Sequence, residues 1–349
     1  LGSSWVRLHW GGGSYRIRAM FRFIKTLATV ALTTALEGLQ QPVCLLLAFT
    51  GIELTVLQPL VQLHAFGESG RLTRDSGLAF MLVTGMLIAT FTSGFTLSNE
   101  IKSGTVATAL SKPVSRPLFL FGKFLGAMLV VIVFCWCDTF AVLFAERCSE
   151  HYLETATQVG QVRDVLCGVL AMAAPVLALG KAAFVNWRFR FRFGLWFFIA
   201  LSVIQPLLFG LLGFLTRSGS WAGWANYHLE MDFRIVTAAA LVVMLLGIFS
   251  ALATAMSTRL QTGAAVAGSF AILFVGFLAD SQLGGRRGIL PQLLYSLVPD
   301  VQHFWLADSL ADGGVIPFRY LMQAGTYALT YIAFVLMLGA VSFDKRDLG

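Results

Sequence analysis

Glu53 and Asp138 are the only acidic side chains that lie well inside apolar runs of this 349-residue sequence. A charged side chain at membrane depth costs roughly 2.5–3.5 kcal/mol on insertion scales. Such an acid is either a polar contact or proton-coupled site in a transport pathway, or a neutral group hydrogen-bonded within helix packing. Neither acid has a Lys or Arg beside it in its run, which argues against a proton relay.

The cysteines offer little further chemistry. Cys135 and Cys137 flank Trp136, and residues i and i+2 of a helix point to different faces, so we expect no metal there. Cys148 and Cys167 stand near the two ends of one expected external loop, where an oxidising compartment would allow a disulfide. Because no catalytic triad, metal-ligand spacing or cofactor motif emerges from the sequence, we expect neither an enzyme nor a cofactor or metal bound to this chain.

The elements that carry these residues belong to a membrane protein. Hydrophobic residues make up 57% of the sequence and charged residues 12%, against roughly 25% charged residues in a soluble domain. Apolar runs of about 20 residues can each cross a bilayer as a helix, and lipid tolerates no unpaired backbone groups. We therefore expect an all-α polytopic bundle of about eight spans, at residues 43–63, 77–97, 118–144, 165–186, 193–215, 235–257, 263–280 and 321–343.

The basic residues predict the orientation. If eight spans alternate across the membrane, most of the 25 Lys and Arg fall on the side of the two termini. The positive-inside rule then places both termini in the cytoplasm. The net charge of +7 is thus mainly a topology signal, and we expect no nucleic-acid partner.

Two further segments lie outside the spans. Residues 1–19 are rich in Gly and Ser without a helical period, so we expect a non-native or disordered extension and a natural start at Met20. From Met20 to Leu39 the spacing predicts an interfacial helix on the inner leaflet, or else an extension of the first span. Residues 284–317 are expected to form short external helices in the outer interface.

A polar stretch from Ser98 to Arg116 separates two of the expected spans. Residues 99–111 suit a short cytoplasmic helix, with Glu100 near its start, where the helix dipole favours an anion. Pro113 would prevent its continuation. A structured protrusion of this kind is a surface through which a soluble partner can exert force on the spans.

A longer pattern, E-x3-G-T-x4-L-S-x-P-V-S-R-x5-G-K, runs through this stretch into the next span. Its members are Glu100, Gly104, Thr105, Leu110, Ser111, Pro113, Val114, Ser115, Arg116, Gly122 and Lys123. The segments YSLVPDVQHF at 295–304 and FDKRDL at 343–348 follow in order. Together these motifs resemble ABC-2 type transporter permeases, and most closely the group that includes the permeases of nitrous-oxide-reductase and other multi-copper enzyme maturation systems.

The resemblance implies that the polar stretch, 98–116, is a coupling helix that docks on a separate nucleotide-binding ATPase. The coupling residues would be Glu100, Gly104, Thr105, Pro113, Ser115, Arg116, Gly122 and Lys123. ATP and Mg would bind that partner, because the Gly-Lys pair at 122–123 lacks the remainder of a Walker A motif. A second permease chain, surrounding lipid and the bacterial cytoplasmic (inner) membrane are also implied.

Six spans are usual in that family, so residues 165–215 would be an inserted helical pair within a single transmembrane domain at 20–348. An ion-coupled secondary transporter or a channel is the alternative function, and an intramembrane enzyme is the third. Lipid, peptide, drug, polysaccharide and a component of metalloenzyme assembly all stay open as substrates.

Overall fold

Nine helices and two strands make up the described part of the computed structural model, which comprises residues 11–62, 68–102, 115–155, 158–217, 231–283, 298–306 and 314–345 with 220, 221 and 223. They are α1 (Gly11–Gln40), α2 (Pro42–Val61), α3 (Ser69–Lys102), α5 (Arg116–Cys148), β1 (His151–Thr155), β2 (Gln158–Val162), α6 (Val165–Phe189), α7 (Phe193–Leu212), α8 (Arg234–Ser257), α9 (Thr262–Leu283) and α12 (Phe318–Asp344). Within that part, all of these helices except α1 and α9 are long and apolar enough to cross a membrane. The expected helical, multi-span architecture is confirmed.

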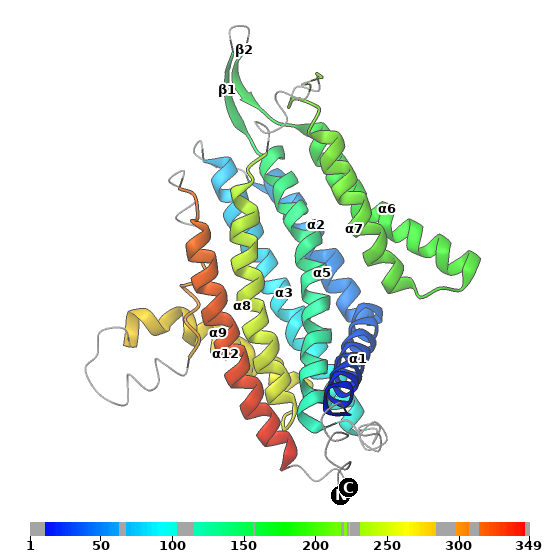
Figure 1. The fold of residues 1–349 in the computed structure, drawn as a ribbon. Helices are drawn as coiled ribbons and strands as arrows, with labels where there is room; N and C mark the ends of the chain where they lie inside the picture. Colours follow the sequence, from blue (N-terminus) through cyan, green and yellow to red (C-terminus); the bar gives the residue numbers. More distant parts are fainter. Residues whose placement is uncertain are drawn as a thin grey trace, which may run out of the picture.

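Helices α3, α5 and α8 contact one another and form the centre of the bundle (Figure 1). Of their most apolar stretches, 61%, 67% and 67% are buried, against 28% for α12 at the periphery. Gly85 of α3 makes this packing possible, since a Cβ there would come within 2.5 Å of the Leu246 side chain of α8. Phe134 of α5 also packs at this glycine, so the three helices meet there.

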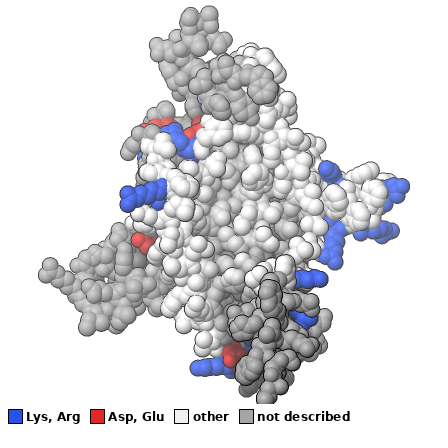
Figure 2. All heavy atoms as spheres, viewed as in Figure 1, with Lys and Arg blue, Asp and Glu red and all other residues white. Residues whose placement is uncertain are grey.

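Helices α6 and α7 form a hairpin whose turn projects away from the bundle (Figure 1). Pro175 lies inside α6 and Pro206 inside α7, and a proline removes a backbone hydrogen bond and bends a helix. Arg190 ends α6 in the left-handed conformation, with φ 60°. Lys and Arg gather at this turn and towards the ends of the bundle, and an uncharged face lies between them (Figure 2).

Several boundaries differ from the expected ones. Helix α1 begins at Gly11 rather than Met20, so the stretch 11–19 is helical, and extended backbone at Gln41 separates α1 from α2. A two-stranded antiparallel hairpin, β1–β2, is an exception to the all-α expectation. The expected span at 263–280 corresponds to α9, whose apolar part, Thr262–Leu278, is shorter than the seven spans and which lies across the long helices in Figure 1.

Candidate functional site

A buried lysine lies where α3 ends and α5 begins, which we call the lower end of the bundle (Figure 1). The Lys123 side chain is only 4% exposed, and its Nζ lies 2.7 Å from Glu100 Oε1 and 3.8 Å from Glu37 Oε2. Nζ also lies 5.6 Å from the centroid of the Phe119 ring. The ion pairs of Lys123 thus join α1, α3 and α5, and we call Glu37, Glu100 and Lys123 the lysine cluster.

Glu100 lies within α3. The sequence had predicted instead that it stands near the start of a separate short helix. Residues 99–102 continue α3. The ammonium of Lys123, 2.7 Å from Oε1, stabilises the charge of Glu100. The sequence identified these two residues correctly as members of one motif but did not predict that they pair with each other.

Arg116, the first residue of α5, forms hydrogen bonds at the same end of the bundle. Arg116 donates from Nη1 to the carbonyl oxygen of Asp344 at 2.7 Å, and Ser115 before it is the extended N-cap residue. Arg259, after α8, donates from Nη2 to the Ser342 carbonyl at 2.8 Å. Both guanidinium groups therefore meet the last turn of α12, where the helix dipole favours cations.

Gly122 is used for packing against α1. A Cβ at Gly122 would lie 2.7 Å from Val30, and one at Gly126 would lie 2.6 Å from the Ala31 carbonyl oxygen. The Gly-x-x-x-Gly pair is thus the close-packing face expected for helices in a membrane. Because Gly122 and Lys123 lie within the bundle, neither presents a free surface to a soluble partner.

The other expected coupling residues, Gly104, Thr105 and Pro113, lie outside the described residues. Their segment, 103–114, is bounded by the lysine cluster on one side and by Arg116 on the other. The motif therefore supplies anchors at both ends of the segment.

The two intramembrane acids differ in their surroundings. Asp138 of α5 is completely buried, and neither carboxyl oxygen has a hydrogen-bond partner among the described residues. Thr55 of α2 lies beside it, but its hydroxyl donates to the Gly51 carbonyl at 3.0 Å. Glu53 is half-buried, and no ion pair or hydrogen bond in the described part joins it to Asp138.

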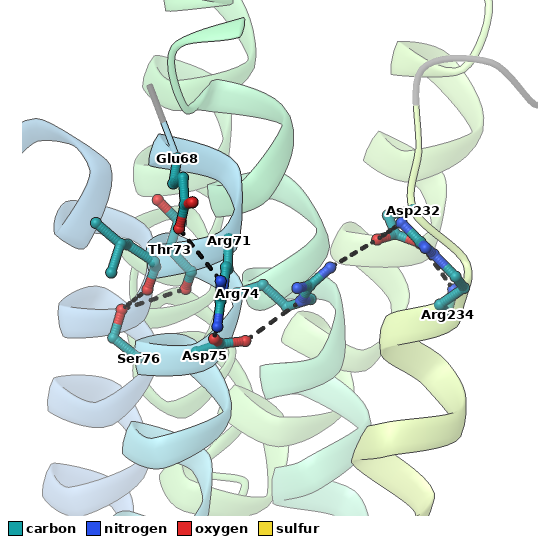
Figure 3. Close-up of polar contacts among 9 residues, drawn as sticks. Glu68, Arg71, Thr73, Arg74, Asp75, Ser76, Asp232 and Arg234 are labelled. Atoms are coloured by element: carbon teal, nitrogen blue, oxygen red, sulfur yellow. Dashed lines mark hydrogen bonds and ion pairs between the residues drawn. The ribbon is translucent and has the colours of Figure 1, made fainter. Parts of the chain in front are cut away.

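The opposite, upper end of the bundle contains ion pairs that the sequence analysis missed (Figure 3). Arg74 of α3 donates to Asp232 at 3.2 Å, and Arg234 donates to the same carboxylate at 2.8 and 3.0 Å. Burial raises the pKa of Asp232, but the hydrogen bonds from Arg234 and the charges of both arginines outweigh it, so this pKa lies below its ordinary value. A usable signal was present, since Arg74 and Asp232 each stand directly before an expected span on the same side.

Arg147 forms the most deeply buried of these contacts. Its side chain is 0% exposed and donates from Nε to Asp164 at 2.7 Å. Nη1 and Nη2 donate to the carbonyl oxygens of Leu212 and Leu215 at 2.6 and 2.7 Å. One guanidinium thereby links the end of α5, the N-cap of α6 and the end of α7.

The expected disulfide between Cys148 and Cys167 is not formed. Both are buried free thiols, and the Cys167 thiol instead points to the Phe144 carbonyl at 3.7 Å. Helix α6 begins at Val165 with Asp164 as its cap, and Cys167 faces the bundle rather than an open loop.

The chain was also compared with known proteins. No protein-family model matches it. No curated protein matches it either.

Proposed function

We propose that this chain is the membrane-spanning permease subunit of an ABC-2 type transporter. A separate nucleotide-binding subunit would bind Mg-ATP and dock on the segment around 103–114. One observation carries the proposal most strongly: this segment joins α3 and α5, the two longest of the described helices, of 34 and 33 residues, and both belong to the buried centre.

The anchors at the two ends of the segment support a role in transmitting force. The Glu100–Lys123 pair fixes the end of α3 to α5, and Glu37 extends this contact to α1. Arg116 fixes the start of α5 to the end of α12. A displacement of the segment would therefore move four helices together rather than bend a loose loop.

In the proposed cycle, two permease chains in the bacterial inner membrane form one pathway. ATP-driven closure of two partner subunits displaces both coupling segments and shifts the spans between inward-facing and outward-facing states. The lower end would then be cytoplasmic, with both termini on that side.

Co-purification from native membranes tests this function. The tagged chain is expected to recover an ATPase with Walker A and B motifs, and Gly104→Leu is expected to abolish this recovery by adding bulk at the docking segment. Gly180→Leu is the matched control, because a Cβ at Gly180 meets nothing within 4 Å. Recovery of the ATPase by both variants, or by neither variant nor wild type, would contradict the proposal.

A proton-coupled carrier is the second candidate, favoured by the complete burial of Asp138 within α5, although no Lys or Arg lies beside it in its apolar run. In proteoliposomes without ATP, a carrier would acidify the lumen when substrate moves, and Asp138→Asn would abolish this signal. An ABC permease would show no such ATP-independent proton flux.

A further inference from the structure

A groove of about 400 Å³ opens between α5, α7 and α8, away from the lysine cluster and its segment. Its lining includes Trp136 and Phe140 of α5, Phe209 of α7, Phe233, and Val236 and Ala240 of α8, and none of the described residues that line it is charged. Because Trp136 is 51% exposed and Val236 45% exposed, the groove is open along its outer side.

The groove has the length of one leaflet of a bilayer. It runs from Phe233 to Val243 along α8 and from Leu143 back to Ile132 along α5. At 1.5 Å per residue both stretches measure about 15–17 Å, which is about half of the hydrocarbon thickness of about 30 Å. Its upper end lies at the first turn of α8, and its lower end near the middle of that helix.

Aromatic edge contacts hold the wall of the groove in place. Ring centroids are 5.1 Å apart for Trp136–Phe140, 5.6 Å for Phe140–Phe209 and 6.0 Å for Phe209–Phe233, and each pair is close to perpendicular. Such T-shaped contacts are favourable beyond the area they bury. The wall is therefore formed by the fold itself and does not need an occupant to shape it.

The mouth of the groove carries both signs of charge. Arg234 follows Phe233, and its side chain is 35% exposed. Its Nε and Nη2 donate to Asp232, whereas Nη1 makes no hydrogen bond to the described residues. A phosphate oxygen is the natural acceptor for Nη1. The neighbouring Asp232 carboxylate already accepts hydrogen bonds from Arg74 and Arg234.

We propose that this groove binds one acyl chain of a glycerophospholipid, with the phosphate on Arg234. The apolar lining and leaflet length select the acyl chain, and Arg234 at the mouth selects a phosphate-bearing headgroup over an uncharged one. This site is independent of the proposed transport function.

Photolabelling of the full chain in nanodiscs tests the site. The probe is phosphatidylethanolamine with a diazirine near the end of one acyl chain, and adducts are mapped by mass spectrometry. Labelling is expected to concentrate on peptides that cover 132–143 and 233–243. Unlabelled phosphatidylethanolamine should compete better than diacylglycerol, which has no phosphate. This comparison requires no variant.

Two variants sharpen the test. Ala240→Phe should fill the groove and remove most of this labelling, whereas Ala173→Phe, at a half-buried alanine of α6 outside the groove, should not. Arg234→Gln should weaken competition by the phospholipid about tenfold, the size of one charge-assisted hydrogen bond, but leave labelling by a diazirine fatty alcohol unchanged. Three results would overturn the proposal: uniform labelling of all exposed helices, equal competition by both lipids, or cross-linking of the groove to a second copy of the chain.

Discussion

The two ends of the bundle hold their helices by different means. At the upper end, the completely buried Arg147 uses three nitrogens to bind one carboxylate and two backbone carbonyls. At the lower end, Lys123 offers one ammonium to two carboxylates, and the farther of them, Glu37, is 52% exposed. A planar guanidinium fixes geometry, whereas an ammonium is a rotatable point charge. Arg147 therefore fixes the geometry of its three helices at the upper end, whereas at the lower end only the outer contact of Lys123, to the half-exposed Glu37, can readily be exchanged.

Arg147→Met should have the largest effect. It leaves the buried Asp164 carboxylate and two carbonyl groups without their donor, and breaking one side of a buried pair costs about 3–5 kcal/mol. We expect poor accumulation in membranes and a large fall in unfolding temperature in detergent. Arg147→Lys should recover only part of the loss, and full stability of the methionine variant would contradict the rigid upper end.

Charge reversal at the lower end should have an intermediate effect. Lys123→Glu places three carboxylates together and should destabilise the chain by about 1.5–3 kcal/mol, the value of a charged hydrogen bond. Adding Glu100→Lys restores opposite charges at the 2.7 Å contact and should recover at least half of the loss. Thermal unfolding of the two single variants and the double variant gives the coupling free energy between Lys123 and Glu100. Additive losses would show that the ion pair does not contribute to stability.

Glu37→Gln should cost less than 1 kcal/mol. Its carboxylate is half-exposed and 3.8 Å from Lys123, and exposed ion pairs contribute about 0–1 kcal/mol. Unfolding temperatures at low and high salt measure the effect, which salt should shrink further. A loss as large as that of Lys123→Glu would make Glu37 an equal member of the lysine cluster.

Sequence patterns could predict seven of the eight expected spans, because apolar length and composition identify helices that can cross a membrane. The eighth, at 263–280, corresponds to a shorter apolar helix. Sequence patterns could not predict the pairing of Arg74 with Asp232, which are 158 residues apart, since nothing local specifies the packing of α3 on α8. The position of α9 depends in the same way on a distant contact, because Gly276 packs closely against Val301. Glu100 was placed wrongly because α3 continues beyond the point where its apolar run ends.

The smallest expected effect concerns pH at the upper end. The lowered pKa of Asp232 means that its ion pairs stabilise the fold fully above the unfolded-state pKa of about 3.9. This contribution is lost as the pH falls through the lower folded-state value. The difference in unfolding temperature between wild type and Asp232→Asn should therefore be constant near neutral pH and shrink below about pH 4. A difference that grows on acidification would contradict the sign of the shift.

Site-specific photocross-linking from the segment 103–114 tests directly whether an ATPase docks there. A photoreactive amino acid replaces Thr105 in the full chain within native membranes, and the adduct is identified by mass spectrometry. We expect a single soluble partner with Walker A and B motifs, and a lower yield from a photoreactive residue at Ala173 as control. Absence of any such ATPase among the adducts, from a chain that inserts and accumulates normally, would contradict the proposed coupling function.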